Sequence, residues 1–339
     1  MDYINYIKQS PYKGFTGYGG GVAGLGFFSG GMTPQALFGG GQGTLGPSIQ
    51  AVDIDTTGNA TAYGTLGSPQ VWSQAACSNG EDRGIWGGGT GPTGPTDNMH
   101  YIGFNDPQNT STFGDLTAAR SGVAAAANDT RGIWYGAGSQ PQMSTMDYVT
   151  IATTGNASSF GNIDYNAEFS SGLASATRAL FAGGQGPGSP PFQSFARDYI
   201  RYVTIANTGD ASDFGSLVRQ KKYLGGMASS TRGVWGGGFY NSGPGGSSSH
   251  VVDEMDYVTI ANTGSASDFG NLSSDRAWNS GASNEDRGIL FGGFDNTNYF
   301  NSIDYITIAT TGNSSDFGDL ASSKTYANGG SCAGGGIGA

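Results

Sequence analysis

Few residues of this 339-residue chain are of the types that carry out chemistry. The two histidines, His100 and His250, stand in unrelated surroundings, whereas a copper site needs several histidine and tyrosine ligands around one ion. The four glutamates lack the arginine cluster of a sialidase-like site, and no Gly-x-Ser-x-Gly elbow or cysteine–histidine metal spacing is present. We therefore expect no catalytic residue, no metal, no cofactor and no enzymatic activity.

Five arginines recur at the start of one apolar motif, as in Arg131-Gly-Ile-Trp, and could form a ring of anion-binding groups. A residue repeated at one place in every repeat usually packs in the same way in each. We therefore interpret them as structural, either paired with Asp147, Asp256 or Asp304 or stacked on an aromatic ring. The five are Arg83, Arg131, Arg178, Arg232 and Arg287.

The composition excludes several classes of function. With 26 acidic and 15 basic side chains the net charge is −11, which disfavours nucleic acid as a partner. No run of about 18 apolar residues occurs, so no membrane insertion is expected. The N-terminus lacks a basic head followed by an apolar stretch, so we expect no secretory signal and synthesis in a cytoplasm. The two cysteines, Cys77 and Cys332, are too few to staple the fold.

One segment, Met146 to Gly161, recurs along the whole chain and sets the organisation of the protein. A tyrosine stands twelve residues before an aromatic–glycine pair, as Tyr148 stands before Phe160. Dividing 339 residues by a period of about 48 residues predicts seven repeats in a single domain, 1–339. The repeats are approximately 1–40, 41–88, 89–136, 137–183, 184–237, 238–292 and 293–339. The recurring tyrosines include Tyr148, Tyr202, Tyr257 and Tyr305, and the tryptophans of the arginine motif are Trp86, Trp134 and Trp235.

Each repeat contains four strand signals and no helical periodicity. They are an alternating strand through Tyr148, a short strand from Phe160, a strand of small residues such as 122–127, and the arginine strand. Four short strands repeated seven times predict an all-β, seven-bladed β-propeller with four-stranded blades. The small-residue strand suits the innermost position, where the blades converge. A β-solenoid is the alternative, but its coils usually have shorter periods.

The apolar pair ending in Gly-Gly, the tyrosine strand after it, and a basic residue before the small strand together resemble the kelch-type propeller. The chain departs from kelch in having Phe or Tyr followed by Gly where kelch has a tryptophan. In kelch order, strands from about 326–339 would share a blade with strands from about 1–17, so the N-terminal and C-terminal strands would close the ring. The amino-acid sequence of the repeats also resembles that of repeat proteins of tailed phages, notably cyanophages.

Two connections are longer than their equivalents, 184–200 and 238–255. They join equivalent strands of adjacent repeats, so we expect them on one face of the ring, where loops commonly carry binding. Loops also change length without any use. The residues proposed to bind a partner, with aromatics expected to be exposed, are Phe192, Phe195, Arg197, Phe239, Tyr240, Asn241 and His250.

The resemblance to phage proteins implies a non-enzymatic virion structural protein, most readily a propeller on the tail, fibre or baseplate. It would act as a docking platform or bind the host surface. Its partners would be other virion proteins of the tail or capsid, and a glycan or receptor of the host. Two other functions stay open, a capsid decoration protein and a carbohydrate-binding, lectin-like module. A lectin should repeat one polar and aromatic site in several blades, whereas a hydrolase would need convergent carboxylates that the sequence does not offer.

Overall fold

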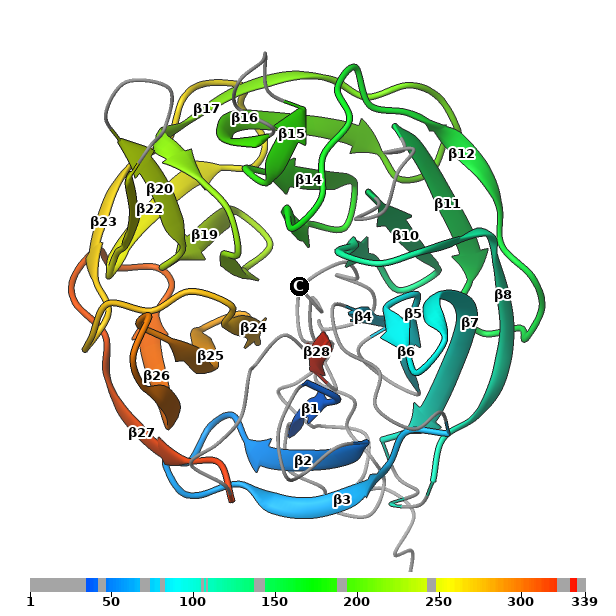
Figure 1. The fold of residues 1–339 in the computed structure, drawn as a ribbon, viewed down its shortest axis with the longest axis horizontal. Coiled ribbons are helices and arrows are strands. Elements are labelled where there is room, and N and C mark those ends of the chain that lie inside the picture. The colour runs from blue at the N-terminus through cyan, green and yellow to red at the C-terminus, as the bar shows by residue number, and fades with distance from the viewer. Residues whose placement is uncertain are drawn as a thin grey trace, which may run out of the picture.

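The computed structural model is a ring of antiparallel sheets around a central axis (Figure 1). Within the described residues it contains strands and turns but no helix. The described residues are 35–41, 47–67, 74–79, 83–104, 107, 109–136, 144–187, 194–242, 248–321 and 330–333.

Six sheets, here called blades 1 to 6, make up the ring, and each runs from an inner strand at the axis to an outer strand at the rim. Blade 1 is β28 (Gly330–Ala333), β1 (Gln35–Gly39), β2 (Ser48–Asp53) and β3 (Thr61–Thr65). Blade 2 is β4 (Ala75–Ser78), β5 (Arg83–Gly87), β7 (Gly94–Gly103) and β8 (Ser111–Arg120). Blade 3 is β9 (Ala124–Ala127), β10 (Arg131–Tyr135), β11 (Thr145–Thr150) and β12 (Ser158–Asn162).

The other three blades have the same order of strands. Blade 4 is β13 (Ser171–Ala174), β14 (Arg178–Ala182), β16 (Ser194–Thr204) and β17 (Ser212–Lys221). Blade 5 is β18 (Gly225–Ala228), β19 (Arg232–Gly236), β22 (Glu254–Thr259) and β23 (Ser267–Asn271). Blade 6 is β24 (Ser280–Ser283), β25 (Arg287–Phe294), β26 (Tyr299–Thr307) and β27 (Ser315–Asp319). Short extra strands are β6 (Thr90–Gly91), β15 (Gln185–Pro187), β20 (Phe239–Ser242) and β21 (Ser248–Val251).

The described residues form six blades, where the repeat length predicts seven. The inner strands β28, β4, β9, β13, β18 and β24 contact one another in this order, and β24 contacts β28. The predicted count of seven comes from dividing the whole length by the period, which includes the residues before β1. Those residues, 1–34, lie outside the described part. The expected pairing of residues 1–17 with the C-terminal strands lies outside it too. Within it, β28 pairs antiparallel with β1.

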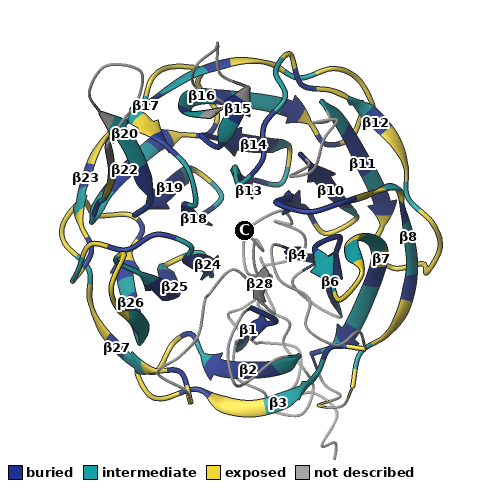
Figure 2. Ribbon diagram, in the orientation of Figure 1, coloured by how far each residue is buried: buried dark blue, intermediate teal, exposed yellow. Residues whose placement is uncertain are grey.

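The small-residue strand is innermost, as the sequence predicts, because neighbouring inner strands almost touch. A Cβ added to Gly172 of blade 4 would lie 2.2 Å from the carbonyl oxygen of Ala125 in blade 3. Next outward, large side chains fill the space between sheets. Trp134 of blade 3 is fully buried, and its indole nitrogen donates a hydrogen bond to the Ala75 oxygen of blade 2 at 3.3 Å. Trp86 and Trp235 are buried at the same strand position, and Figure 2 shows the buried inner strands of the ring.

The repeated arginines also connect blades. The guanidinium of Arg131 lies 4.9 Å from the centre of the Tyr148 ring in its own blade and donates to the Ile205 oxygen of blade 4 at 2.9 Å. Stacking on an aromatic ring, one of the two structural roles expected, is therefore what these side chains do. The same stacking occurs for Arg83 on Tyr101, Arg178 on Tyr202, Arg232 on Tyr257 and Arg287 on Tyr305.

The aspartates that the sequence offered to these arginines pair with other cations. Asp147 binds Arg120 of the preceding blade at 3.1 Å, and both side chains are buried. Equivalent buried pairs join Lys221 to Asp256 at 2.9 Å and Arg276 to Asp304 at 3.2 Å. Because a buried charge without its partner is costly, each of these pairs ties one blade to the next in a single register.

The two repeated glycines at the rim form the closest approach between blades. Gly161 follows the anchor Phe160 in blade 3, and Gly209 lies in the turn of blade 4. The Gly209 N–H donates to the Phe160 oxygen at 2.7 Å, and a Cβ on Gly161 would lie 2.1 Å from the Gly209 oxygen. The backbones meet on the Gly161 side only, so Gly161 cannot carry a side chain, whereas a Cβ on Gly209 would point into open space. The same approach joins Gly114 to Gly155, Gly215 to Gly264, Gly270 to Gly312 and Gly318 to Gly58.

We expect Gly161→Ala to lower the free energy of unfolding by about 1–3 kcal/mol, because the added methyl pushes two blades apart. Gly209→Ala is the matched control, since a Cβ there would meet nothing within 4 Å. It should change stability by less than about 0.5 kcal/mol. Chemical denaturation of both variants measures the difference, and equal losses would show that the close approach does not limit the packing.

Candidate binding face

The two long connections form hairpins on one face of adjacent blades, as the sequence predicts. β15 pairs with the start of β16 on blade 4, and β20 pairs with β21 on blade 5. The hairpins contact each other, because the Ala196 N–H donates to the Asn241 Oδ1 at 3.2 Å. Figure 1 shows β15 and β20 above their blades, near one another on the ring. We call this side of the ring the hairpin face.

The residues predicted to bind a partner differ in their surroundings. Phe239 was expected to be exposed, but it is only 5% exposed and packs edge-on against Tyr223 and Trp278, at 5.8 and 4.9 Å between ring centres. It is a core residue at the base of its hairpin. Phe195 and Asn241 are half-buried between the hairpins, and Phe192 lies outside the described residues.

A row of cationic and aromatic groups lies along the second hairpin. The rings of Tyr240 and His250 stack at 4.9 Å, and the Arg219 guanidinium lies 4.8 Å from the centre of the Tyr240 ring. Arg219 is held from its other side by Glu254 at 2.8 Å. Arg197, on the first hairpin, lies 5.9 Å from the centre of the Tyr199 ring. Two of the predicted residues, Tyr240 and His250, thus form one stacked group.

Three aromatic residues that the sequence analysis missed form an arc at the base of the hairpins. Phe169, Tyr223 and Trp278 each stand two residues before the inner strand of blades 4, 5 and 6, and each has a positive φ, of 59°, 62° and 54°. We call these three residues the aromatic arc. In blade 3 the same position is Gly122, with φ 66°. The backbone therefore requires a left-handed residue here, and three blades place a bulky ring where glycine is the unstrained choice.

The arc is held by contacts from blade to blade. The centres of the Phe169 and Tyr223 rings lie 4.4 Å apart and those of Tyr223 and Trp278 lie 4.6 Å apart, with the ring planes tilted by 34° and 50°. The backbone N–H of Tyr223 donates to the Phe169 oxygen at 3.0 Å, and that of Trp278 to the Tyr223 oxygen at 3.1 Å. A left-handed backbone costs an ordinary residue about 1–2 kcal/mol. These contacts offset that cost, and the rings remain half-buried on the hairpin face.

A buried polar relay lies beside the arc. Gln185, the first residue of β15, donates from its amide to Glu168 at 2.7 Å and accepts a hydrogen bond from the Lys222 ammonium. Burial raises the pKa of Glu168, while the hydrogen bond from Gln185 and the charge of Lys222 partly oppose that rise. Burial lowers the pKa of Lys222. Gln185 at the base of the first hairpin therefore joins Glu168 to Lys222, which lies between blades 4 and 5. Burial disfavours the charged form of both Glu168 and Lys222.

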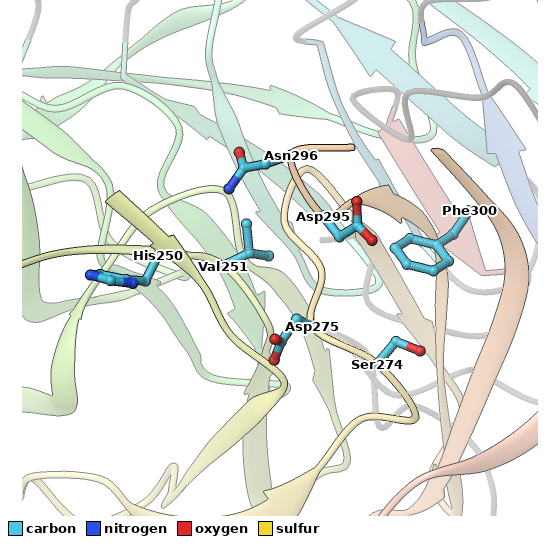
Figure 3. A pocket seen from close by; sticks show the side chains of 7 residues that line it. All are labelled: His250, Val251, Ser274, Asp275, Asp295, Asn296 and Phe300. Atoms are coloured by element: carbon cyan, nitrogen blue, oxygen red, sulfur yellow. The ribbon is translucent and has the colours of Figure 1, made fainter. Parts of the chain in front are cut away.

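A pocket of about 510 Å³ opens on the same face, between the second hairpin and the turn that joins β25 to β26 (Figure 3). It lies next to the arc, because Trp278 contacts Phe294 at the end of β25 at 5.6 Å between ring centres. Most of the lining groups are polar and come from three separate segments. They are His250 and Val251 of β21, Ser274 and Asp275 before β24, and Asp295, Asn296 and Phe300 of the β25–β26 hairpin.

Comparison of the chain with known proteins assigns it to no family. No family model matches the chain, and no curated protein matches it. Among the described residues, no group of three or more histidine, cysteine or acidic side chains is placed to hold a metal ion. Within that same part of the chain, no helix reaches the length and hydrophobicity needed to cross a bilayer. The described part of this face displays aromatic rings and hydrogen-bonding groups.

One signal could have revealed the arc from the sequence. The position two residues before each small strand reads Gly122, Phe169, Tyr223 and Trp278 in four consecutive repeats. A column that holds glycine in one repeat and aromatic residues in the next three indicates a special backbone rather than a core position. The tyrosine and phenylalanine columns that define the repeat do not include this position.

The raised pKa of Glu168 predicts a pH dependence. The folded protein holds a proton at this site more tightly than the unfolded chain does. The contribution to stability is therefore largest below the ordinary pKa of 4.5 and is lost as the pH rises through the raised value. Glu168→Gln keeps an oxygen that accepts from Gln185 but carries no charge.

We expect Glu168→Gln to be more stable than the wild type at about pH 7, with the difference shrinking toward about pH 4. Urea denaturation across this range measures it. Asp268→Asn, which removes an exposed charge from the rim, is the control and should follow the wild-type curve. If the free energy of unfolding of Glu168→Gln ran parallel to that of the wild type across this pH range, the raised pKa of Glu168 would be contradicted.

Proposed function

We propose that this chain is a non-enzymatic structural protein of a tailed-phage virion, a kelch-like propeller associated with the tail, fibre or baseplate. In this proposal the hairpin face docks a virion protein or the host surface. The observation that carries it is the contact between the two hairpins, through the Ala196 N–H and the Asn241 side chain. Two insertions from adjacent blades that hydrogen-bond to each other make one continuous projection on a rigid ring.

The physical character of the projection supports binding rather than catalysis. Its described side chains include the aromatic and amide groups Phe195, Tyr240 and Asn241, and the cation Arg219 of β17 lies against Tyr240, in an acidic protein. Tyrosine, arginine and asparagine give large contact areas and adaptable hydrogen bonds at interfaces. The resemblance of the repeats to those of tailed phages supports the virion as the place of action.

The location is tested by antibody–gold labelling of purified virions of the encoding phage. Gold at the tail or fibres is the expected result. Gold over the shell would replace this proposal with a capsid decoration protein, and virions without label would overturn a virion role altogether.

The role of the hairpins is tested with the double variant Phe195→Ser, Tyr240→Ser. We expect its association with virions or host cells to fall at least about tenfold, since interface aromatics commonly contribute more than 1 kcal/mol each. The control is Asp129→Asn, Thr177→Asn, because these exposed residues lie in turns between the inner and second strands, which face the opposite side of the ring. Pull-down and cell-binding assays measure the difference, and equal binding by both variants would overturn the role of the hairpin face.

A further inference from the structure

The pocket beside the second hairpin combines one aromatic ring with hydrogen-bonding groups on the surrounding walls. Phe300 lies at the start of β26, and the guanidinium of the buried Arg276 lies 4.9 Å from the centre of its ring. That contact occupies one face of the ring and fixes its orientation. Phe300 also lines the pocket, as Figure 3 shows. An aromatic ring held from behind in this way can offer its other face to a ligand.

The polar wall is suited to hydroxyl groups. Ser274 supplies a hydroxyl that donates and accepts, Asn296 an amide that donates and accepts, and Asp275 a carboxylate that accepts. Asn296 has a φ of 80°, a conformation that asparagine tolerates better than most residues. Because these groups come from different segments of the chain, they can bind several hydroxyls of one small molecule in a defined orientation.

The same residues disfavour a metal ion. The carboxylate of Asp295 is used within its own turn, where it accepts from the N–H groups of Thr297 and Asn298 at 2.8 and 2.6 Å, and from the Asn298 amide at 3.1 Å. Asp275 is then the one other carboxylate of the described lining, and it takes a hydrogen bond from the Asp253 backbone. A calcium ion takes six to eight oxygen ligands, usually with several carboxylates among them.

Charge disfavours an anionic ligand. Partial burial raises the pKa of Asp275, and the negative charges of Asp253 and Asp295 raise it further, while a hydrogen bond from the Asp253 backbone partly opposes the rise. A carboxylate or sulfate placed in the pocket would meet the same repulsion, in a protein whose net charge is −11. The ligand that fits is therefore uncharged, carries hydroxyls, and has an apolar face for Phe300.

We propose that this pocket binds a short neutral saccharide, one or two pyranose rings, with the C–H face of a sugar on Phe300 and its hydroxyls on Asp275, Asn296 and Ser274. The volume of about 510 Å³ is within the usual range for small-molecule sites. This inference rests on the proposed function, in that it names the class of host-surface ligand that the hairpin face would recognise.

Ligand-observed NMR with the full-length protein tests the proposal. The probes are glucose, galactose, N-acetylglucosamine and their disaccharides, with N-acetylneuraminic acid as the anionic comparison. We expect at least one neutral sugar to bind with a Kd of about 1 mM and the anionic sugar not to bind, because a single shallow site gives weak affinity.

The variants Asp275→Asn and Asn296→Gly should each weaken binding of the neutral sugar severalfold, since each removes hydrogen bonds to hydroxyls. Asn296→Gly preserves the left-handed backbone, so it tests the amide without refolding the turn. Phe300→Leu should weaken binding about tenfold through loss of the ring face. Asp268→Asn changes the charge by the same amount as Asp275→Asn but on the rim strand β23, and should bind as the wild type does.

Failure of neutral sugars to bind at about 10 mM, a range in which such weak sites still load, would overturn the proposal. Preferential binding of the anionic sugar, or an equal loss in Asp268→Asn, would overturn it as well. Failure here is distinguishable from failure of the proposed function, because association with virions is measured in the absence of sugar. If the Phe195→Ser, Tyr240→Ser variant loses docking while no sugar binds, the docking role stands and the saccharide site falls.

Discussion

Direct contact between the backbones of neighbouring blades is the constraint on which this ring depends. At the rim, the glycine after the anchor aromatic meets a turn glycine of the next blade. A Cβ added to Gly161, for example, would lie 2.1 Å from the Gly209 oxygen. At the axis, a Cβ on Gly172 would lie 2.2 Å from the Ala125 oxygen. Between these two contacts there is room for large side chains such as Trp134. The abundance of glycine, 62 of 339 residues, partly reflects these requirements, which recur in successive blades.

Buried ion pairs between blades set the register of one blade against the next, while glycine lets the blades approach each other. The buried pairs, such as Arg120 with Asp147, each join two blades. Blade 4 shows that the two partners depend on each other. Where blades 3, 5 and 6 have the aspartate, it has Arg201, and the position that would hold the cation is Ala167. Arg201 pairs instead with Asp164 and Asp213 at the surface, at 2.7 and 2.6 Å, so no buried charge is left alone at this junction.

The hairpin face departs from the repeat in several ways at once. Blades 4 and 5 carry the two hairpins, blades 4 to 6 carry the aromatic arc, and the pocket lies between blades 5 and 6. Blades 3 to 6 share the left-handed backbone at the position that Gly122 occupies in blade 3. Substituting an aromatic residue there costs conformational energy, which is offset only where the neighbouring ring packs against it. The arc therefore needs adjacent blades to change together.

The sequence alone determined the all-β propeller, the order of strands in a blade, the innermost place of the small-residue strand, and the shared face of the two insertions. These follow from local patterns that repeat: alternation in Tyr148-Val-Thr-Ile, turn residues, and a constant offset between anchors. Only the tertiary structure decided the six described blades, the cation that each aspartate binds, the burial of Phe239, and the meeting of the arc, relay and pocket. Those features depend on contacts between residues of different blades, often 30 or more positions apart, such as Lys221 and Asp256. A periodic sequence shows which positions are equivalent, but ring closure and packing decide which of them touch.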